Sequence, residues 1–151
     1  MRKRYLEDFR PGEAIDLGTT TVDRDEILEF ARRYDPQPFH VDEEAARHSI
    51  YGGLIASGWH TAAMVMRVLV DGLVEGTVTM GSPGIDEIRW LKPVRPGDTL
   101  SVKAHILDVV PSRSKADRGH IRSRYEVSNQ RGEVVMTMIG LGIYGRRPDG
   151  R

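Results

Sequence analysis

The pattern of hydrophobic and polar residues divides the chain into a helix-rich first half and a strand-rich second half. Apolar residues recur at helical spacing within residues 24–34, and a longer apolar segment runs over residues 57–74. In the second half, apolar and polar residues alternate in residues 99–106 and 121–127, which is typical of half-buried strands. Helices followed by antiparallel strands predict an α+β fold.

Local signals mark where several of these elements begin and end. Asp23, followed three residues later by a Glu, resembles the start of a helix, and Pro36 prevents that helix from continuing. Residues 42–47 read as a short helix with acidic residues in its first turn. Residues 13–22 and 88–94 predict two further strands, and the polar residues 111–119 predict an exposed loop.

The apolar segment over residues 57–74 predicts a core helix. Its hydrophobic side chains cover most of the helix circumference, and only Arg67 and Asp71 form a polar edge. These charges, together with His60, argue against a membrane span. We therefore expect one domain over residues 1–151, with a core of about 8–145, in which an antiparallel sheet wraps around a long central apolar helix.

The last predicted strand, residues 134–144, differs from the other strands. Both of its alternating sets are largely apolar or Gly, so both faces of this strand are expected to be covered. The core helix would cover one face, and a helix or a partner subunit the other. We expect a homodimer or higher homo-oligomer on this ground, and a heterodimer stays open.

Charge and composition narrow the classes of function. Twenty-two basic and 22 acidic residues cancel, which argues against a nucleic-acid partner. The chain has no cysteine, so it has no thiol nucleophile and no thiolate metal site. Its basic start lacks the apolar run of a signal peptide, and we expect a cytoplasmic protein without a membrane partner.

Candidate chemistry is concentrated in residues 34–40, which read Tyr-Asp-Pro-Gln-Pro-Phe-His. Asp35 and His40 lie five residues apart on a backbone that Pro36 and Pro38 stiffen into a loop. A carboxylate and an imidazole that share one water can perform general acid/base catalysis, which is worth ~10²–10⁴ in rate. Asp-Pro pairs are also common in turns, and Asp35 as a simple helix terminator is the alternative.

Three blocks of residues, in this order, resemble the MaoC-like hydratases. The first block is residues 34–42, the second is Gly-Leu-Ile-Ala-Ser-Gly-Trp-His at 53–60, and the third is Leu-Lys-Pro-Val-Arg-Pro-Gly-Asp-Thr-Leu at 91–100. The family has a single hot-dog domain and includes the (R)-specific enoyl-CoA hydratases and (3R)-hydroxyacyl dehydratases. The resemblance covers nearly the whole chain.

The resemblance implies a role for three residues. Asp35 and His40 match the catalytic pair, which adds water to a trans-2-enoyl thioester or removes it in reverse. Gly58 matches the glycine whose backbone N–H binds the thioester carbonyl at the start of the core helix. The implied substrate is carried by coenzyme A or by an acyl carrier protein, and neither a cofactor nor a metal is expected.

Two positions depart from the family pattern. Gln37 stands where an Asn is usual, and Met66 stands where some members have a serine. Both are candidates for lining the pocket, together with Ile50, Tyr51 and Trp59. His60 is expected to be a hydrogen-bonded structural or pocket-lining residue.

Basic residues near the third block and in the loop that follows have two readings. They could meet the phosphates of coenzyme A, or they could form an ordinary solvated surface among interspersed acidic residues. These residues are Arg89, Lys92, Arg95, Arg113, Lys115 and Arg118.

Two other functions fit the same fold. A carboxylate can activate water toward the carbonyl carbon, which would make the protein an acyl-CoA thioesterase. An acyl-thioester-binding subunit without catalysis is the third reading. The Asp35 and His40 pair favours hydration, because binding alone needs no group placed for proton transfer.

Overall fold

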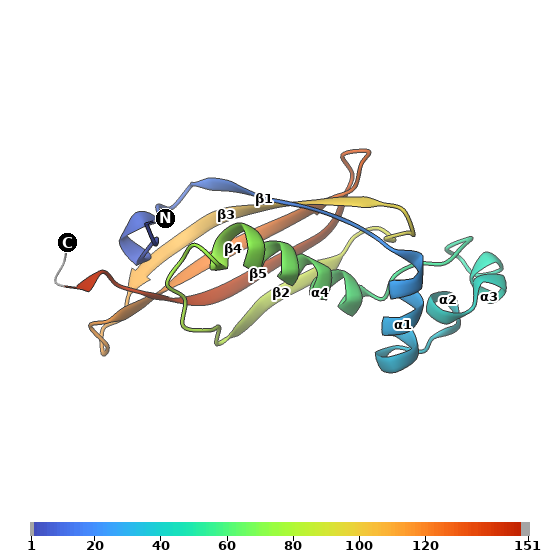
Figure 1. Ribbon diagram of the computed structural model, residues 1–151, viewed down its shortest axis with the longest axis horizontal. Coiled ribbons are helices and arrows are strands. Elements are labelled where there is room, and N and C mark those ends of the chain that lie inside the picture. The colour runs from blue at the N-terminus through green and yellow to red at the C-terminus, as the bar shows by residue number, and fades with distance from the viewer. Residues whose placement is uncertain (1, 149–151) are drawn as a thin grey trace.

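The computed structural model describes residues 2–148, whose strands form one antiparallel sheet (Figure 1). The sheet has five strands in the order β1-β3-β4-β5-β2, so β1 and β2 are its edges. The strands are β1 Ala14–Thr21, β2 Gly84–Trp90, β3 Thr99–Pro111, β4 Arg118–Ser128 and β5 Val134–Gly145. The prediction of an α+β fold is confirmed. Residue 1 and residues 149–151, the ends of the predicted domain, lie outside the described residues.

Alternation of apolar and polar side chains explains the strands of the second half. In β4, Ile121, Ser123, Tyr125 and Val127 are buried, while the residues between them are partly exposed. Two strands are longer than predicted, because β3 and β4 remain paired as far as Pro111 and Gly119. The predicted loop over 111–119 is therefore shortened to residues 112–117.

The three short helices of the first half follow their sequence signals. Helix α1 spans Arg24–Tyr34, and the Asp23 carboxylate accepts the N–H of Glu26 at 3.0 Å. Helix α3 spans Glu43–Arg47 and is capped by Asp42. The expectation of a plain loop over residues 36–40 is wrong, because Pro38 begins a further helix, α2, over Pro38–Val41. Proline fits the first position of a helix, where its missing N–H costs no hydrogen bond.

The core helix, α4, spans Gly58–Leu69 and continues as a π-helical turn over Val70–Val74. Val65, Val68 and Leu69 are buried against the sheet. The sheet wraps around this helix as expected but leaves one side of α4 open. Trp59 is 61% exposed and Met66 is 50% exposed, because the sheet covers only one side of α4 in the single chain.

The arrangement places the start of α4 beside the small helices. In Figure 1, α4 lies across one face of the sheet, and α1, α2 and α3 gather at the end where α4 begins. The 3-10 turn that precedes β1 and the end of β5 lie at the opposite end of the sheet. A short 3-10 turn, Leu6–Asp8, precedes β1. None of the helices within residues 2–148 combines the length and the apolar character that a membrane crossing requires.

Candidate active site

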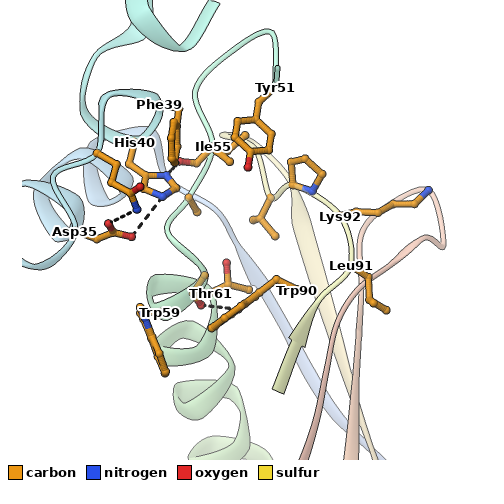
Figure 2. A pocket seen from close by; sticks show the side chains of 15 residues that line it. Asp35, Phe39, His40, Tyr51, Ile55, Trp59, Thr61, Trp90, Leu91 and Lys92 are labelled. Carbon is orange, nitrogen blue, oxygen red and sulfur yellow. Dashed lines mark hydrogen bonds and ion pairs between the residues drawn. The ribbon is translucent and has the colours of Figure 1, made fainter. Parts of the chain in front are cut away.

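The end of α1 and the start of α2 bring a carboxylate and an imidazole together. Asp35 follows α1 directly, and its N–H donates to the carbonyl of Ala31 at 2.8 Å. His40 lies on α2, five residues further along the chain. Their side chains meet with 3.4 Å between Asp35 Oδ2 and His40 Nε2 (Figure 2).

The His40 ring is buried and has a defined orientation. Its Nδ1 lies 2.7 Å from the carbonyl oxygen of Ile55, so Nδ1 carries a hydrogen that it donates to this oxygen. Phe39 packs edge-on against the ring, with 4.6 Å between the ring centroids. These contacts direct Nε2, the other ring nitrogen, toward Asp35 and the pocket.

Two side chains donate hydrogen bonds to the Asp35 carboxylate. Gln37 Nε2 donates to Oδ1 and Ser57 Oγ donates to Oδ2, each at 2.7 Å. Burial raises the pKa of Asp35, but these hydrogen bonds and the charge of a protonated His40 outweigh burial and hold the pKa below the ordinary 3.8. Asp35 is therefore a carboxylate at neutral pH.

Ser57 links the carboxylate to the start of α4. A serine at this position usually accepts an N–H from the first turn of its helix. The Ser57 hydroxyl makes no such cap and instead donates to Asp35, and Ser57 is fully buried. The first-turn N–H groups of α4, including that of Gly58, therefore receive no side-chain cap and remain available for a ligand.

Trp90, the last residue of β2, packs directly on Gly58. Its indole Nε1 donates to the Gly58 carbonyl at 2.9 Å. A Cβ atom on Gly58 would lie 2.5–2.7 Å from atoms of the Trp90 ring, so only glycine fits here. Trp59 meets Trp90 edge to face, with 5.2 Å between ring centroids.

These groups face a pocket of about 510 Å³, here called the dyad pocket. Of the predicted lining residues, Gln37, Tyr51 and Trp59 lie in its wall, beside Asp35, His40 and Gly58. The structure places the other two elsewhere. Ile50 is 94% exposed because it lies on the turn after α3, and Met66 lies two turns beyond Gly58, at a second cavity.

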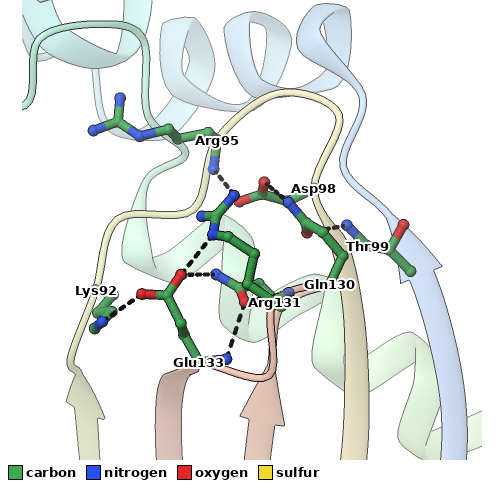
Figure 3. Close-up of polar contacts among 8 residues, drawn as sticks. Lys92, Arg95, Asp98, Thr99, Gln130, Arg131 and Glu133 are labelled. Atoms are coloured by element: carbon green, nitrogen blue, oxygen red, sulfur yellow. Dashed lines mark hydrogen bonds and ion pairs between the residues drawn. The ribbon is translucent and has the colours of Figure 1, made fainter.

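A polar network holds the pocket wall that follows β2 (Figure 3). Asp98 is buried and accepts from the Arg95 N–H and from Gln130 Nε2, each at 2.9 Å. Glu133 accepts from Lys92 and Arg131, and these bonds lower its pKa to about 2. The network ties the segment between β2 and β3 to the hairpin between β4 and β5.

Four of the six predicted phosphate-binding cations are already partnered within the chain. Lys92 pairs with Glu133, Arg89 pairs with Glu87, and Arg118 pairs with Asp117. Arg95 donates to the carbonyl of Tyr51 at 2.6 Å. These partners favour the reading of an ordinary polar surface.

His60 lies outside the dyad pocket. It is buried and stacks on Phe30, with 4.9 Å between ring centroids, and its Nδ1 has no hydrogen-bond partner. Burial lowers the pKa of His60 and keeps it neutral. The expectation of a hydrogen-bonded ring therefore does not hold for Nδ1. Residues 2–148 hold no cluster of three or more His, Cys, Asp or Glu side chains suited to a metal ion.

Sequence reasoning missed two residues of the site, Ser57 and Trp90. Ser57 stands at the start of the predicted helix, and this position signals an ordinary cap and not a carboxylate partner. Trp90 carries no signal beyond being a large aromatic residue within a predicted strand. Both contacts join segments that are more than 20 residues apart, which a local pattern does not reveal.

Comparison with known proteins identifies the family. Residues 8–130 match the family described as MaoC-like domain. The crystal structure of a MaoC-like dehydratase from Rhodospirillum rubrum is 45% identical, with a TM-score of 0.85, covering 96% of this chain and 99% of that one.

Two curated relatives are enzymes by name. The (R)-specific enoyl-CoA hydratase of Rhodospirillum rubrum is 29% identical over 72% of this chain and 74% of its own length. The 3-hydroxybutyryl-CoA dehydratase of Methylorubrum extorquens is 28% identical over 77% of this chain and 72% of its own. The class defined by fold and relatives is that of the hot-dog hydratases and dehydratases, which are hydro-lyases. Within this class, the chain belongs to the MaoC-like domain family.

Proposed function

We propose that this enzyme adds water to a trans-2-enoyl thioester to give a (3R)-hydroxyacyl thioester, or catalyses the reverse dehydration. The observation that carries the proposal is the placement of Asp35 and His40, 3.4 Å apart in one pocket, at the uncapped start of α4. The names of the two curated relatives support an acyl thioester as the substrate.

The proton transfers follow from the states of the two side chains. Asp35, ionised at neutral pH, takes a proton from water as the water oxygen bonds to the β-carbon of the substrate. The π electrons of the C=C bond move toward the thioester carbonyl and form an enolate. His40 Nε2 orients the water and helps to return a proton to the α-carbon. Because Nε2 lies beside Asp35 Oδ2, the proton removed from water can be returned within the site.

The start of α4 stabilises the charge that develops on the thioester oxygen. The N–H of Gly58 has no side-chain cap, and the helix dipole adds positive potential there. A single donor of this kind is worth ~10²–10³ in rate. Glycine at this position also leaves the backbone accessible to the thioester.

We further propose that two copies of the chain form a homodimer across α4 and β2. Trp59 and Met66 on α4, and Ile85 and Trp90 on β2, are 43–61% exposed although all four are large and apolar. Strand β2 pairs only with β5 within the described residues, so its other edge is free. Sedimentation equilibrium would measure the mass of the particle, and a monomer at micromolar concentration would contradict this proposal.

The decisive experiment compares Asp35→Asn and His40→Ala with the wild type on crotonyl-CoA. Hydration removes the conjugated enoyl absorbance, whereas hydrolysis releases a free thiol. We expect absorbance loss in the wild type and a decrease in kcat of ~10²–10⁴ in each variant, because each lacks a proton-transfer group.

Two matched controls separate this effect from a general loss of charge or of an imidazole. Asp16→Asn removes a carboxylate that is 88% exposed, and His48→Ala removes an imidazole that is 75% exposed. Both should retain full activity. Thiol release in place of absorbance loss, or dyad variants as active as the controls, would overturn the proposed function.

A further inference from the structure

Two cavities are lined by different residues along the same two elements, α4 and β2. The dyad pocket contains Trp59 of α4 and Trp90 of β2 in its wall. A second cavity of about 350 Å³, here called the apolar cavity, contains Met66 of α4 and Ile85 of β2. Of the described residues that line either cavity, none lines both.

Trp90 lines the dyad pocket and not the apolar cavity. Its indole packs on Gly58, is held there by the bond from Nε1 to the Gly58 carbonyl, and is supported edge-on by Trp59. The side chain therefore has two independent contacts that keep its ring in place. Figure 2 shows the Trp90 ring in the wall of the dyad pocket, close to Trp59 of α4.

The apolar cavity has room for an acyl chain but contains none of the proposed catalytic groups. The lining residues of β5 include Gly140, which has no side chain to fill the space. A Cβ on Gly140 would lie 3.8 Å from the Tyr125 ring, which is an ordinary contact distance. Met66, Leu69 and Met138 supply apolar walls.

We propose that Trp90, supported by Trp59, is a specificity-determining residue that restricts the enzyme to short acyl chains by separating the dyad pocket from the apolar cavity. This inference rests on the proposed function, because it takes an acyl thioester as the ligand. Removal of the indole would join the two cavities. Each additional methylene that enters an apolar cavity strengthens binding by up to ~4-fold.

The test measures binding of butyryl-CoA and decanoyl-CoA by titration calorimetry. Both acyl chains are saturated, so neither can be hydrated, and the result does not depend on the proposed chemistry. We expect the wild type to bind decanoyl-CoA no more tightly than butyryl-CoA. In Trp90→Ala, the ratio of the two affinities should move toward decanoyl-CoA by ~10-fold or more.

Three further variants make the result specific. Trp90→Phe keeps an aromatic ring without the N–H donor, and should keep the preference of the wild type. Gly140→Leu, added to Trp90→Ala, refills the apolar cavity and should abolish the gain. Val110→Ala removes apolar surface from a residue that is 52% exposed and lines neither cavity, and should change nothing.

Two results would overturn the inference. One is a wild type that already prefers decanoyl-CoA, and the other is a Trp90→Ala variant that alters both affinities by the same factor. If Trp90→Ala does not fold, Trp90→Val is the substitute and carries the same expectation. An enzyme that fails to hydrate crotonyl-CoA but shows the shift in binding would refute the proposed function and keep this inference.

Discussion

The dyad pocket and the apolar cavity are both lined by residues of α4 and β2, yet different forces shape them. In the dyad pocket, hydrogen bonds from Gln37 and Ser57 and the contact of His40 with Ile55 fix the positions of polar atoms. In the apolar cavity, the absence of a side chain at Gly140 leaves open volume. The dyad pocket therefore depends on the positions of atoms, whereas the apolar cavity depends on open volume.

Among the substitutions that compare the two regions, Gly58→Ala has the largest expected effect and tests how little freedom the dyad pocket has. The added methyl would lie within 2.7 Å of the Trp90 ring, so the backbone or the indole must move. We expect kcat for crotonyl-CoA hydration to decrease by ~10²–10³, because the N–H donor is displaced.

The control for this substitution is Gly76→Ala. A Cβ at Gly76 would meet no heavy atom within 4 Å, so this variant should keep wild-type activity. Circular dichroism verifies that both variants are folded. Equal activity in Gly58→Ala and Gly76→Ala would show that the dyad pocket tolerates a methyl group at position 58.

A smaller effect is expected from Ser57→Ala, which removes one hydrogen bond to Asp35. The lost bond normally lowers the pKa of Asp35, so the variant has a higher pKa at this carboxyl. Activity requires the carboxylate, and it is lost as the pH falls through that pKa. The acid limb of the pH profile of kcat/KM should therefore move to higher pH, with a decrease in kcat of ~10-fold near neutral pH.

Ser112→Ala is the matched control, because the Ser112 hydroxyl only accepts from the N–H groups of an exposed turn. Its pH profile should superimpose on that of the wild type. If the acid limb of Ser57→Ala does not move, the ionisation of Asp35 does not set the pH dependence of the activity.

Gly140→Ala is the corresponding test of the apolar cavity and should have almost no effect. Its Cβ would enter open volume, 3.8 Å from Tyr125, and would touch no proposed catalytic group. We expect the rate of crotonyl-CoA hydration to change less than ~2-fold, since substitutions away from such contacts are usually within ±0.5 kcal/mol. A loss as large as that of Gly58→Ala would remove the distinction between the two regions.

The smallest effect concerns stability and is expected from Glu133→Gln in the network beside the dyad pocket. The Glu133 pKa is lowered to about 2, so its ionic contacts stabilise the fold above its ordinary value of 4.5 and are lost as the pH falls toward 2. Thermal unfolding at pH 7 should show a slightly lower midpoint for the variant, because this group is exposed and solvent screens its contacts. The difference in unfolding midpoint between the two proteins should disappear in acid. A difference that is the same at every pH would mean that packing, and not charge, causes it.

Much of the fold could be predicted from the sequence because its signals are local. The alternation in residues 99–106 and the cap at Asp23 each depend on a few neighbouring residues, and both elements formed as expected. The pairing of Asp35 with His40 also follows from short spacing along the chain. The cytoplasmic location stays a prediction.

The remainder depends on contacts between distant segments. The exposure of Trp59 and Met66 follows from how far the sheet extends around α4, which the apolar pattern of the helix does not encode. The interaction of Trp90 with Gly58 joins a strand to a helix across 32 positions. Ile50 was a candidate for the pocket wall, and the turn after α3 directs it to solvent instead.

The position of Ser57 has a consequence for engineering this enzyme toward higher thermal stability. Aspartate is among the strongest residues for the N-terminal cap of a helix, and a design procedure that scores stability alone would favour it at position 57. That carboxylate would stand against the carboxylate of Asp35 and replace a hydrogen-bond donor with a like charge. Variants selected for thermal stability alone should therefore include Ser57→Asp, which would have a higher melting temperature but lower activity.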